Sequence, residues 1–151
     1  MPCQLTNDSL AQYNFTANKN FQYQIFVKDK HGNQNQTPPT FKVAVIADEY
    51  PFIQMLYPYQ VYDITENMKA PLRYSALDDF GISKVDLVYW KEGVADTVRQ
   101  AIFSSKQRIA FQRGEYIWDL SSADFFPEEV YNYYLEVFDN DTINGPKSRK
   151  T

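Results

Sequence analysis

Apolar and polar residues alternate with a period of two along most of this chain, which is typical of strands with one buried face. In the run 21–27, for example, Phe21, Tyr23 and Ile25 fall on the same face. No window of 12 or more residues shows the 3.6-residue apolar period of a helix. Similar runs lie at 41–45, 52–57, 70–76, 82–90, 97–103, 108–112, 115–120, 131–138 and from 147 onward. The pattern predicts an all-β fold of many short strands, with the five glycines between strands where a positive φ is needed.

The composition excludes several classes of function. The net charge is −4, so the basic surface that nucleic-acid binding requires is not expected. There is one cysteine, Cys3, and one histidine, His31, which leaves no internal disulfide and no cysteine-rich zinc site. No apolar run approaches the ~20 residues of a membrane-spanning helix, so direct membrane insertion is not expected either.

An internal repeat indicates two domains. Residues 21–43 and 131–151 both contain an alternating strand that begins with an aromatic residue, an Asp at its end, a polar turn, a proline and a second strand. The Asp residues are Asp29 and Asp139, and their offset of 110 residues is about the length of one sandwich domain. We therefore expect tandem β-sandwich repeats, in which residues 1–46 are the last strands of one domain, 47–51 a linker and 52–151 a second domain.

The second domain contains the short motifs WDL at 118–120, Pro127 and YNYYLEV at 131–137. Together they resemble the pattern of fibronectin type III domains, in which a tyrosine at the start of the sixth strand can hydrogen-bond back to the chain across the corner. The stretch YSALDDFGISKVDLVYW at 74–90 is similar to the segment between the second and third strands of bacterial immunoglobulin (Ig)-like repeats. The resemblance implies that 52–151 is an Ig/fibronectin type III-like sandwich and that 1–46 belongs to a truncated Ig-like domain.

Three longer blocks are more specific: VAVIADEYPFIQ at 43–54, ALDDFGISKVDLVYW at 76–90 and YYLEVFDNDTINGPKSRKT at 133–151. They resemble a family of large, uncharacterised bacterial envelope proteins that is known only as a domain of unknown function. The family implies a membrane-anchored parent protein with tandem Ig-like domains, located in the bacterial cell envelope on the extracytoplasmic side, periplasmic or surface-exposed. Because the segment 147–151 starts a strand and then stops, we expect this chain to be a piece of such a protein, with its last strand truncated.

The strongest chemical candidate is a calcium site shared by two loops. Calcium prefers ~6–8 oxygen ligands from Asp, Asn and backbone carbonyl groups. In a sandwich of this type, the loop at 78–79 and the loop at 139–144 lie at the same end. The candidate ligands are Asp78, Asp79, Asp139, Asn140, Asp141 and Asn144. The simpler alternative is that these side chains bond the backbone of their own turns and bind no metal.

A second candidate is a partner surface on neighbouring strands. If 82–90 and 131–138 pair with the predicted faces inward, the outward residues form one exposed apolar patch, of the kind that marks partner surfaces. These residues are Val88, Trp90, Tyr134 and Phe138. The alternative is that loops of this chain or the first domain cover them.

The sequence therefore favours a non-enzymatic structural and interaction module, which spaces domains and binds a protein partner or a neighbouring Ig-like repeat. No pair of acidic residues can be assigned to a common cleft for acid–base catalysis. The alternative is an accessory carbohydrate-binding or substrate-positioning module of a secreted hydrolase, whose exposed aromatic rings would stack on sugars. No cofactor is expected apart from the candidate calcium ion.

Overall fold

The computed structural model describes residues 4–7, 10–121, 125–126 and 128–151. Every regular element in this part of the chain is an antiparallel strand and none is a helix, which confirms the all-β prediction. The chain forms two compact units, one ending at Ala47 and the other spanning Asp48–Thr151. The division falls inside the predicted linker 47–51. Since the described part contains no helix, it also contains none that could cross a membrane.

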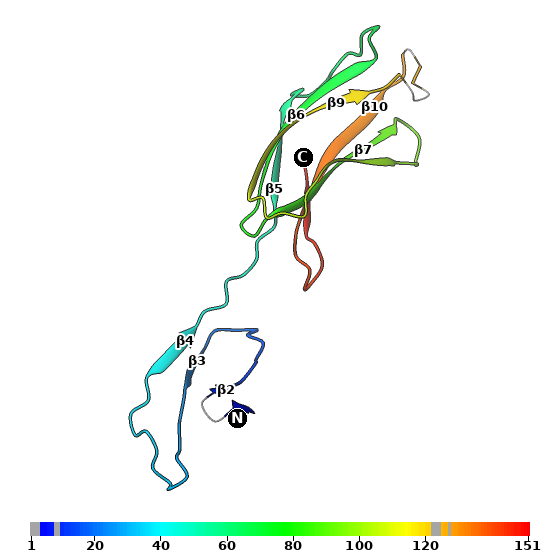
Figure 1. The fold of residues 1–151 in the computed structure, drawn as a ribbon. Coiled ribbons are helices and arrows are strands. Elements are labelled where there is room, and N and C mark those ends of the chain that lie inside the picture. Colours follow the sequence, from blue (N-terminus) through cyan, green and yellow to red (C-terminus); the bar gives the residue numbers. More distant parts are fainter. Residues whose placement is uncertain (1–3, 8–9, 122–124, 127) are drawn as a thin grey trace. The chain divides into compact units, whose positions relative to one another are not determined.

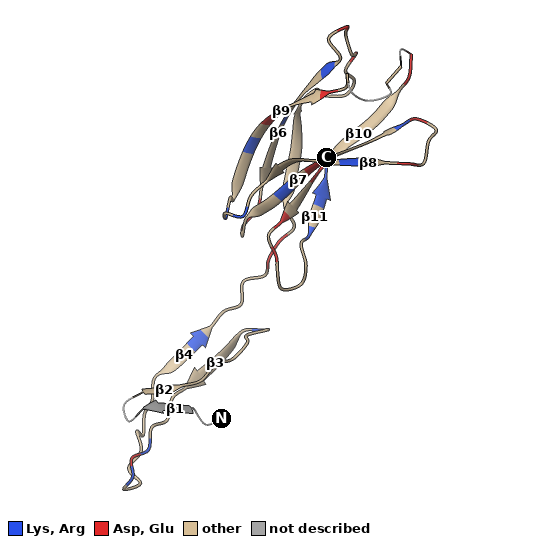
Figure 2. Ribbon diagram, turned by 45° about the vertical axis from the view of Figure 1, so that its right-hand side comes forward, with Lys and Arg blue, Asp and Glu red and all other residues tan. Residues whose placement is uncertain are grey.

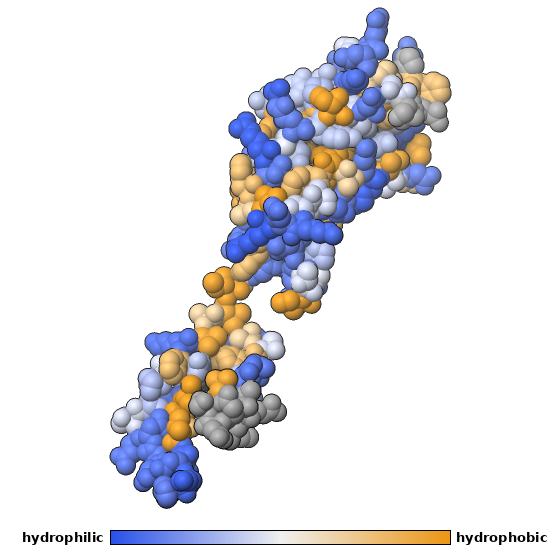
Figure 3. All heavy atoms as spheres, viewed as in Figure 1, coloured by the Kyte–Doolittle hydropathy of each residue, from blue (hydrophilic) through white to orange (hydrophobic). Residues whose placement is uncertain are grey.

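The first unit consists of two separate two-stranded sheets. Their strands are β1 (Gln4–Asn7), β2 (Leu10–Gln12), β3 (Phe21–Gln24) and β4 (Thr40–Val43). Pairing of β3 with β4 ends at Gln24, so the predicted strand 21–27 is shorter than expected, and Phe26 and Val27 are 57% and 63% exposed. Hydrophobic side chains accordingly appear on the surface of this unit (Figure 3).

The second unit contains a three-stranded sheet in the order β5-β6-β9 and a four-stranded sheet in the order β11-β10-β7-β8. Within the first of these sheets, β6 and β9 lie side by side (Figure 1). The strands are β5 (Phe52–Tyr57), β6 (Lys69–Leu77), β7 (Ile82–Lys91), β8 (Val98–Ser104), β9 (Phe111–Asp119), β10 (Tyr131–Asp139) and β11 (Ser148–Lys150).

The inner faces of these two sheets form one hydrophobic core. Alternate residues of β6, such as Leu72 and Tyr74, are buried, as the period-two pattern predicts. The four-stranded sheet contributes alternate residues of its two central strands, such as Leu87 and Leu135, which are completely buried. The whole buried cluster comprises Ile53, Ala70, Leu72, Tyr74, Ala76, Ile82, Val85, Leu87, Trp118, Leu120, Leu135 and Val137.

One strand differs from the sequence expectation. The runs 108–112 and 115–120 were predicted as separate strands, but β9 continues through Gly114. The other four glycines have a positive φ, whereas Gly114 does not, so the expectation of a turn was wrong at this position. Gly114 is paired with Tyr74 on β6, and a Cβ atom here would lie 2.4 Å from Cζ of that ring. The absence of a side chain makes room for a buried tyrosine.

The two segments of the internal repeat both form antiparallel hairpins, β3–β4 and β10–β11. Each of the two aspartates accepts the backbone N–H two residues on. Oδ1 of Asp29 accepts that of His31 at 2.8 Å, and Oδ1 of Asp139 accepts that of Asp141 at 3.1 Å. Aspartates commonly stabilise turns in this way.

Candidate functional site

Two loops of the second unit meet at the end of the unit where its first residue, Asp48, lies. The β6–β7 loop and the β10–β11 loop are joined by Nδ2 of Asn140, which donates to the carbonyl oxygen of Phe80 at 3.1 Å. Beside this contact, Asp48, Asp78 and Asp139 each offer one carboxylate oxygen within 4.8 Å of the others. We refer to these three residues as the carboxylate cluster.

Asp78 is held by its own turn. Its Oδ2 accepts the backbone N–H groups of Phe80 at 3.0 Å and Gly81 at 2.6 Å. Its Oδ1 is buried and has no hydrogen-bond partner, and the residue is only 4% exposed. Burial raises the pKa of Asp78, the two N–H bonds oppose that rise, and the negative charges of Asp79 and Asp139 add to it.

In Asp139, as in Asp78, one carboxylate oxygen accepts backbone N–H groups and the other has no hydrogen-bond partner. Oδ1 accepts the backbone N–H groups of Asp141 at 3.1 Å and Lys147 at 2.9 Å. Oδ2 is buried without a hydrogen-bond partner, and its nearest cation is Nζ of Lys147 at 3.9 Å. The backbone therefore fixes both Asp78 and Asp139 while leaving one oxygen of each free to bind something else.

Asp48 completes the cluster from the first residue of the unit. Nζ of Lys147 forms an ion pair with its carboxylate and donates to its carbonyl oxygen at 3.0 Å. These contacts raise the pKa of Lys147, with the bond to the Asp48 carboxylate as the largest cause. Oδ1 of Asp48 is buried and has no hydrogen-bond partner.

The structure brings only part of the predicted calcium set together. Asp78 and Asp139 are in the cluster, whereas Asp79 is exposed and Asn140 connects the loops. Asp141 and Asn144 interact with each other: Oδ1 of Asp141 accepts the Asn144 N–H at 3.1 Å, and Oδ2 accepts its Nδ2 at 3.2 Å. The backbone bonds from Ile143 and Asn144 lower the pKa of Asp141. For these two residues the geometry matches the turn-capping alternative.

Asp48 is the ligand candidate that sequence reasoning missed. It lies 30 residues before Asp78 and 91 before Asp139, in the segment interpreted as a linker. The available signal was an acidic pair, Asp48-Glu49, immediately before the first strand of the unit. A segment that enters the unit at the end where two acidic loops meet brings its own side chains to that end.

The predicted partner surface lies on the outer face of the four-stranded sheet, but it is not one exposed apolar patch. Val88 is only 2% exposed, which corrects the expectation for this residue. Val88 lies on a central strand, directly opposite Tyr134 on β10 and Arg99 on β8, so it has a large residue on each side. Trp90, Tyr134 and Phe138 are half-buried.

Charged groups divide the aromatic residues of this face into two parts. The Trp90 and Tyr134 rings are in contact, with centroids 5.9 Å apart, and Nζ of Lys150 lies 4.5 Å from the Tyr134 centroid. At the other end, Nζ of Lys84 lies 4.4 Å from the Phe138 centroid. Figure 2 shows basic positions on β8 and β11, the two edge strands of this sheet.

Between the two parts, a guanidinium group bridges two buried carboxylates. Nη1 of Arg99 lies 2.8 Å from Oδ2 of Asp86, and its Nη2 lies 2.7 Å from Oε2 of Glu136. Asp86 and Glu136 are directly opposite each other on β7 and β10. We refer to these three residues as the outer-face network.

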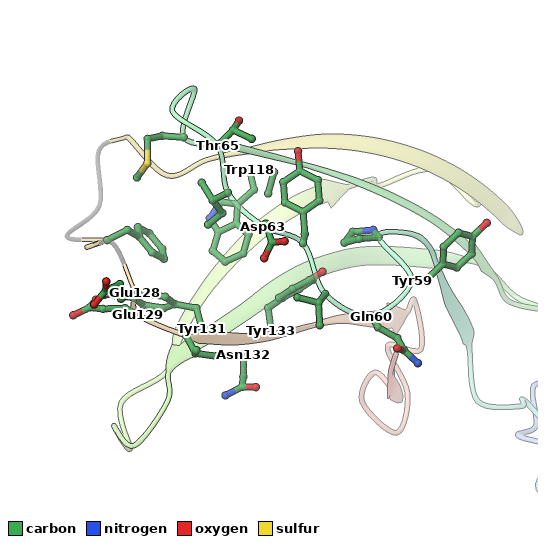
Figure 4. A pocket seen from close by; sticks show the side chains of 18 of the residues that line it. Tyr59, Gln60, Asp63, Thr65, Trp118, Glu128, Glu129, Tyr131, Asn132 and Tyr133 are labelled. Carbon is green, nitrogen blue, oxygen red and sulfur yellow. Dashed lines mark hydrogen bonds between the residues drawn. The ribbon is translucent and has the colours of Figure 1, made fainter.

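A hollow of about 900 Å³ lies away from the carboxylate cluster, between the β5–β6 connection and the segment before β10. Aromatic and acidic side chains line it. Glu128 and Glu129 lie at one end and Tyr59 at the other, with Asp63 and Trp118 between them (Figure 4). The rim is apolar and open to solvent, since Tyr59 and Phe126 are 88% and 63% exposed. No pattern in the sequence pointed to this hollow.

Glu129 is anchored at the edge of the hollow. It forms an ion pair with Lys91 and accepts the Tyr131 hydroxyl at 2.8 Å. Both bonds lower the pKa of Glu129, and the bond from Lys91 has the larger effect. They favour the charged form of the carboxylate.

Comparison with known proteins adds no identity to these observations. No known family matches the chain, and no curated protein matches it significantly.

Proposed function

We propose that the second unit is an Ig/fibronectin type III-like sandwich that serves as a non-enzymatic structural and interaction module. Its strand order supports this type. In Ig-like sandwiches the third, sixth and seventh strands share one sheet, as β7, β10 and β11 do, while the first, second and fifth share the other. The parent protein that we propose is a membrane-anchored bacterial envelope protein with further Ig-like repeats.

The observation that carries this proposal is the direction of the chain through the unit. The chain enters at the carboxylate cluster with Asp48, and β10 returns to that end with Asp139. Because β11 is antiparallel to β10, β11 runs away from the cluster toward the opposite end. A module whose first and last strands both lead away from the entry point is suited to head-to-tail arrays, in which each unit adds its length.

We expect a second copy of the unit to lengthen the molecule. The test protein is the full chain followed by a second copy of 47–151, joined through the native linker. Its longest dimension in small-angle X-ray scattering should exceed that of the single chain by about 30 Å, the length of nine strand residues at ~3.3 Å each. A tandem protein that is no longer than the single chain would show units folded back on each other and contradict the spacer function.

For the protein partner, we propose the outer face of the four-stranded sheet. Lys84 and Lys150 lie against the Phe138 and Tyr134 rings, so the face presents cations beside aromatic groups. This chemistry is suited to a partner with acidic and apolar side chains.

The second candidate function is carbohydrate binding, and the aromatic hollow favours it. Sugar rings stack on exposed aromatic side chains, and carboxylates accept hydrogen bonds from the sugar hydroxyl groups. Tyr59 and Asp63 supply both kinds of contact in the hollow.

Affinity electrophoresis of the full chain in gels that contain soluble polysaccharides distinguishes the two candidates. The module function predicts that the polysaccharides do not slow the chain. Carbohydrate binding predicts slower migration, which should be lost in Tyr59→Ser and retained in Phe111→Ser, whose aromatic ring is also exposed but lies outside the hollow.

A further inference from the structure

We propose that Asp48, Asp78 and Asp139 form a binding site for one divalent cation, Ca²⁺. The inference goes beyond the spacer function and does not depend on it. It rests on the charge of the cluster, on buried oxygens that lack partners, and on the spacing of the three carboxylates.

The cluster has an excess of negative charge. Three carboxylates meet there, and Lys147 is the cation that pairs with them in the described structure. When the three carboxylates and the Lys147 ammonium are all ionised, the net charge of the four groups is −2, which one divalent cation neutralises. Asp78 and Asp139 are 4% and 1% exposed, and carboxylates this deeply buried are normally paired or bound to a metal.

Lys147 leaves the buried oxygens unsatisfied. Its ammonium group pairs with Asp48 and lies 3.9 Å from Oδ2 of Asp139, which has no hydrogen-bond partner. Oδ1 of Asp78 likewise has none. Buried oxygens without partners are costly, so both call for a further partner, either a hydrogen-bond donor or a cation.

The spacing of the oxygens matches a common calcium ion. Calcium binds oxygen at ~2.3–2.6 Å, so two of its ligands can be up to about 5 Å apart. The three carboxylates have one oxygen each within 4.8 Å of the others. In Asp78 and Asp139 one oxygen is held by backbone N–H groups, which orients the carboxylate before any ion arrives.

The ligand set indicates a weak site. Three protein oxygens are fewer than calcium's ~6–8, and water completes such a shell. We therefore expect a dissociation constant of ~0.1–1 mM, as in extracellular modules. An ion at this point would tie Asp48, the first residue of the unit, to both loops.

The test is a titration of the full chain with CaCl2 that is monitored by isothermal titration calorimetry. We expect one site in the range given, and an increase in Tm of about 5 °C at a calcium concentration ten times Kd. Terbium should report the same site by luminescence excited through tyrosine, because the Tyr50 ring centroid lies 6.0 Å from Nζ of Lys147. Calcium should displace terbium.

Three variants locate the ion. Asp48→Asn should weaken calcium binding at least ~10-fold and still fold, because its side chain is 23% exposed. Asp141→Asn is the matched control, since this nearby carboxylate is engaged by its own turn, and it should change Kd less than ~3-fold. Lys147→Gln should strengthen binding at least ~3-fold, because it removes the competing ammonium.

The proposal is overturned if the folded wild-type chain shows neither calcium heat nor terbium luminescence at 10 times the upper Kd given above. It is also overturned if Asp48→Asn binds as well as wild type, if Asp141→Asn loses as much affinity as Asp48→Asn, or if Lys147→Gln leaves the affinity unchanged. Circular dichroism of each variant shows that the comparison is made between folded proteins.

Discussion

Gly114→Val is expected to lower the free energy of unfolding of the second unit by about 3 kcal/mol, near the upper end of the ~1–3 kcal/mol typical of overpacking. A Cβ at this position would lie 2.4 Å from Cζ and 2.5 Å from the hydroxyl oxygen of Tyr74. Tyr74 is 2% exposed in the core, so its ring has no free space to occupy. The midpoint of urea unfolding measures the effect. Arg113→Val, at an exposed position of the same strand, is the control and should change stability by less than ~0.5 kcal/mol.

A double-mutant cycle shows whether Tyr74 is the cause. Tyr74→Leu shortens the side chain and should make the subsequent change Gly114→Ala at least ~1 kcal/mol less costly than it is in the wild type. The hydroxyl group of Tyr74 is buried together with its ring. This burial raises the pKa of Tyr74 to about 12, and a hydrogen bond with Gln112 opposes the rise. If the two changes are simply additive, contact between Gly114 and the ring does not explain the cost.

Gly114 also shows where reading strands from sequence fails. The period-two pattern located the other strands of the second unit to within one or two residues, because one face of each is buried. A glycine inside a strand looks the same in sequence as a glycine in a turn. What distinguishes Gly114 is the tyrosine opposite, and Tyr74 is 40 residues away in the chain. The pairing of β6 with β9 is long-range information that the local pattern does not contain.

The candidate site was predictable to a similar extent. Asp78 and Asp139 could be placed together because the order of strands in a sandwich brings their loops to one end. Asp141 could not be separated from Asp139 by composition, since both are turn aspartates. The separation depends on burial: Asp139 is 1% exposed, whereas Asp141 is partly open and bonds its own turn. Asp48 required knowledge of where the linker joins the unit.

Val88 shows that the face on which a residue lies can be predicted correctly while its exposure is not. Alternation correctly assigned it to the outer face, but the outer face of a central strand is not always exposed. Val88 has a long side chain beside it on each neighbouring strand, Arg99 on β8 and Tyr134 on β10. The prediction of an apolar patch also overlooked Asp86 and Glu136, which occupy the middle of this face and are almost fully buried.

Arg99→Met is expected to lower the free energy of unfolding by about 2–3 kcal/mol. The change leaves the outer-face network with two buried carboxylates opposite each other, of which Lys84 contacts only Asp86, at 2.8 Å. Breaking a fully buried ion pair costs ~3–5 kcal/mol, and the lower figure allows for the 45% exposure of the Arg99 side chain. Arg73→Met is the matched control. Its ion pair with Glu115 is exposed at 59% and 72%, so its loss should cost less than ~0.5 kcal/mol.

The cost of Arg99→Met should also depend on pH. Burial alone raises the pKa of Glu136, but the bonds from Arg99 and Ser148 outweigh burial and hold the pKa below its ordinary value of 4.5. A carboxylate with a lowered folded-state pKa stabilises the protein above that ordinary value, and the stabilisation is lost as the pH falls through the folded-state pKa. In the variant the contribution of Arg99 is absent, Ser148 still donates to the carboxylate, and protonation of Glu136 removes its buried charge. The difference in unfolding free energy between wild type and variant should therefore be largest between pH 5 and 7 and should shrink below about pH 4. Urea unfolding at several pH values measures this difference, and a gap that stays constant down to pH 3 would show that Glu136 does not depend on Arg99 for its charge.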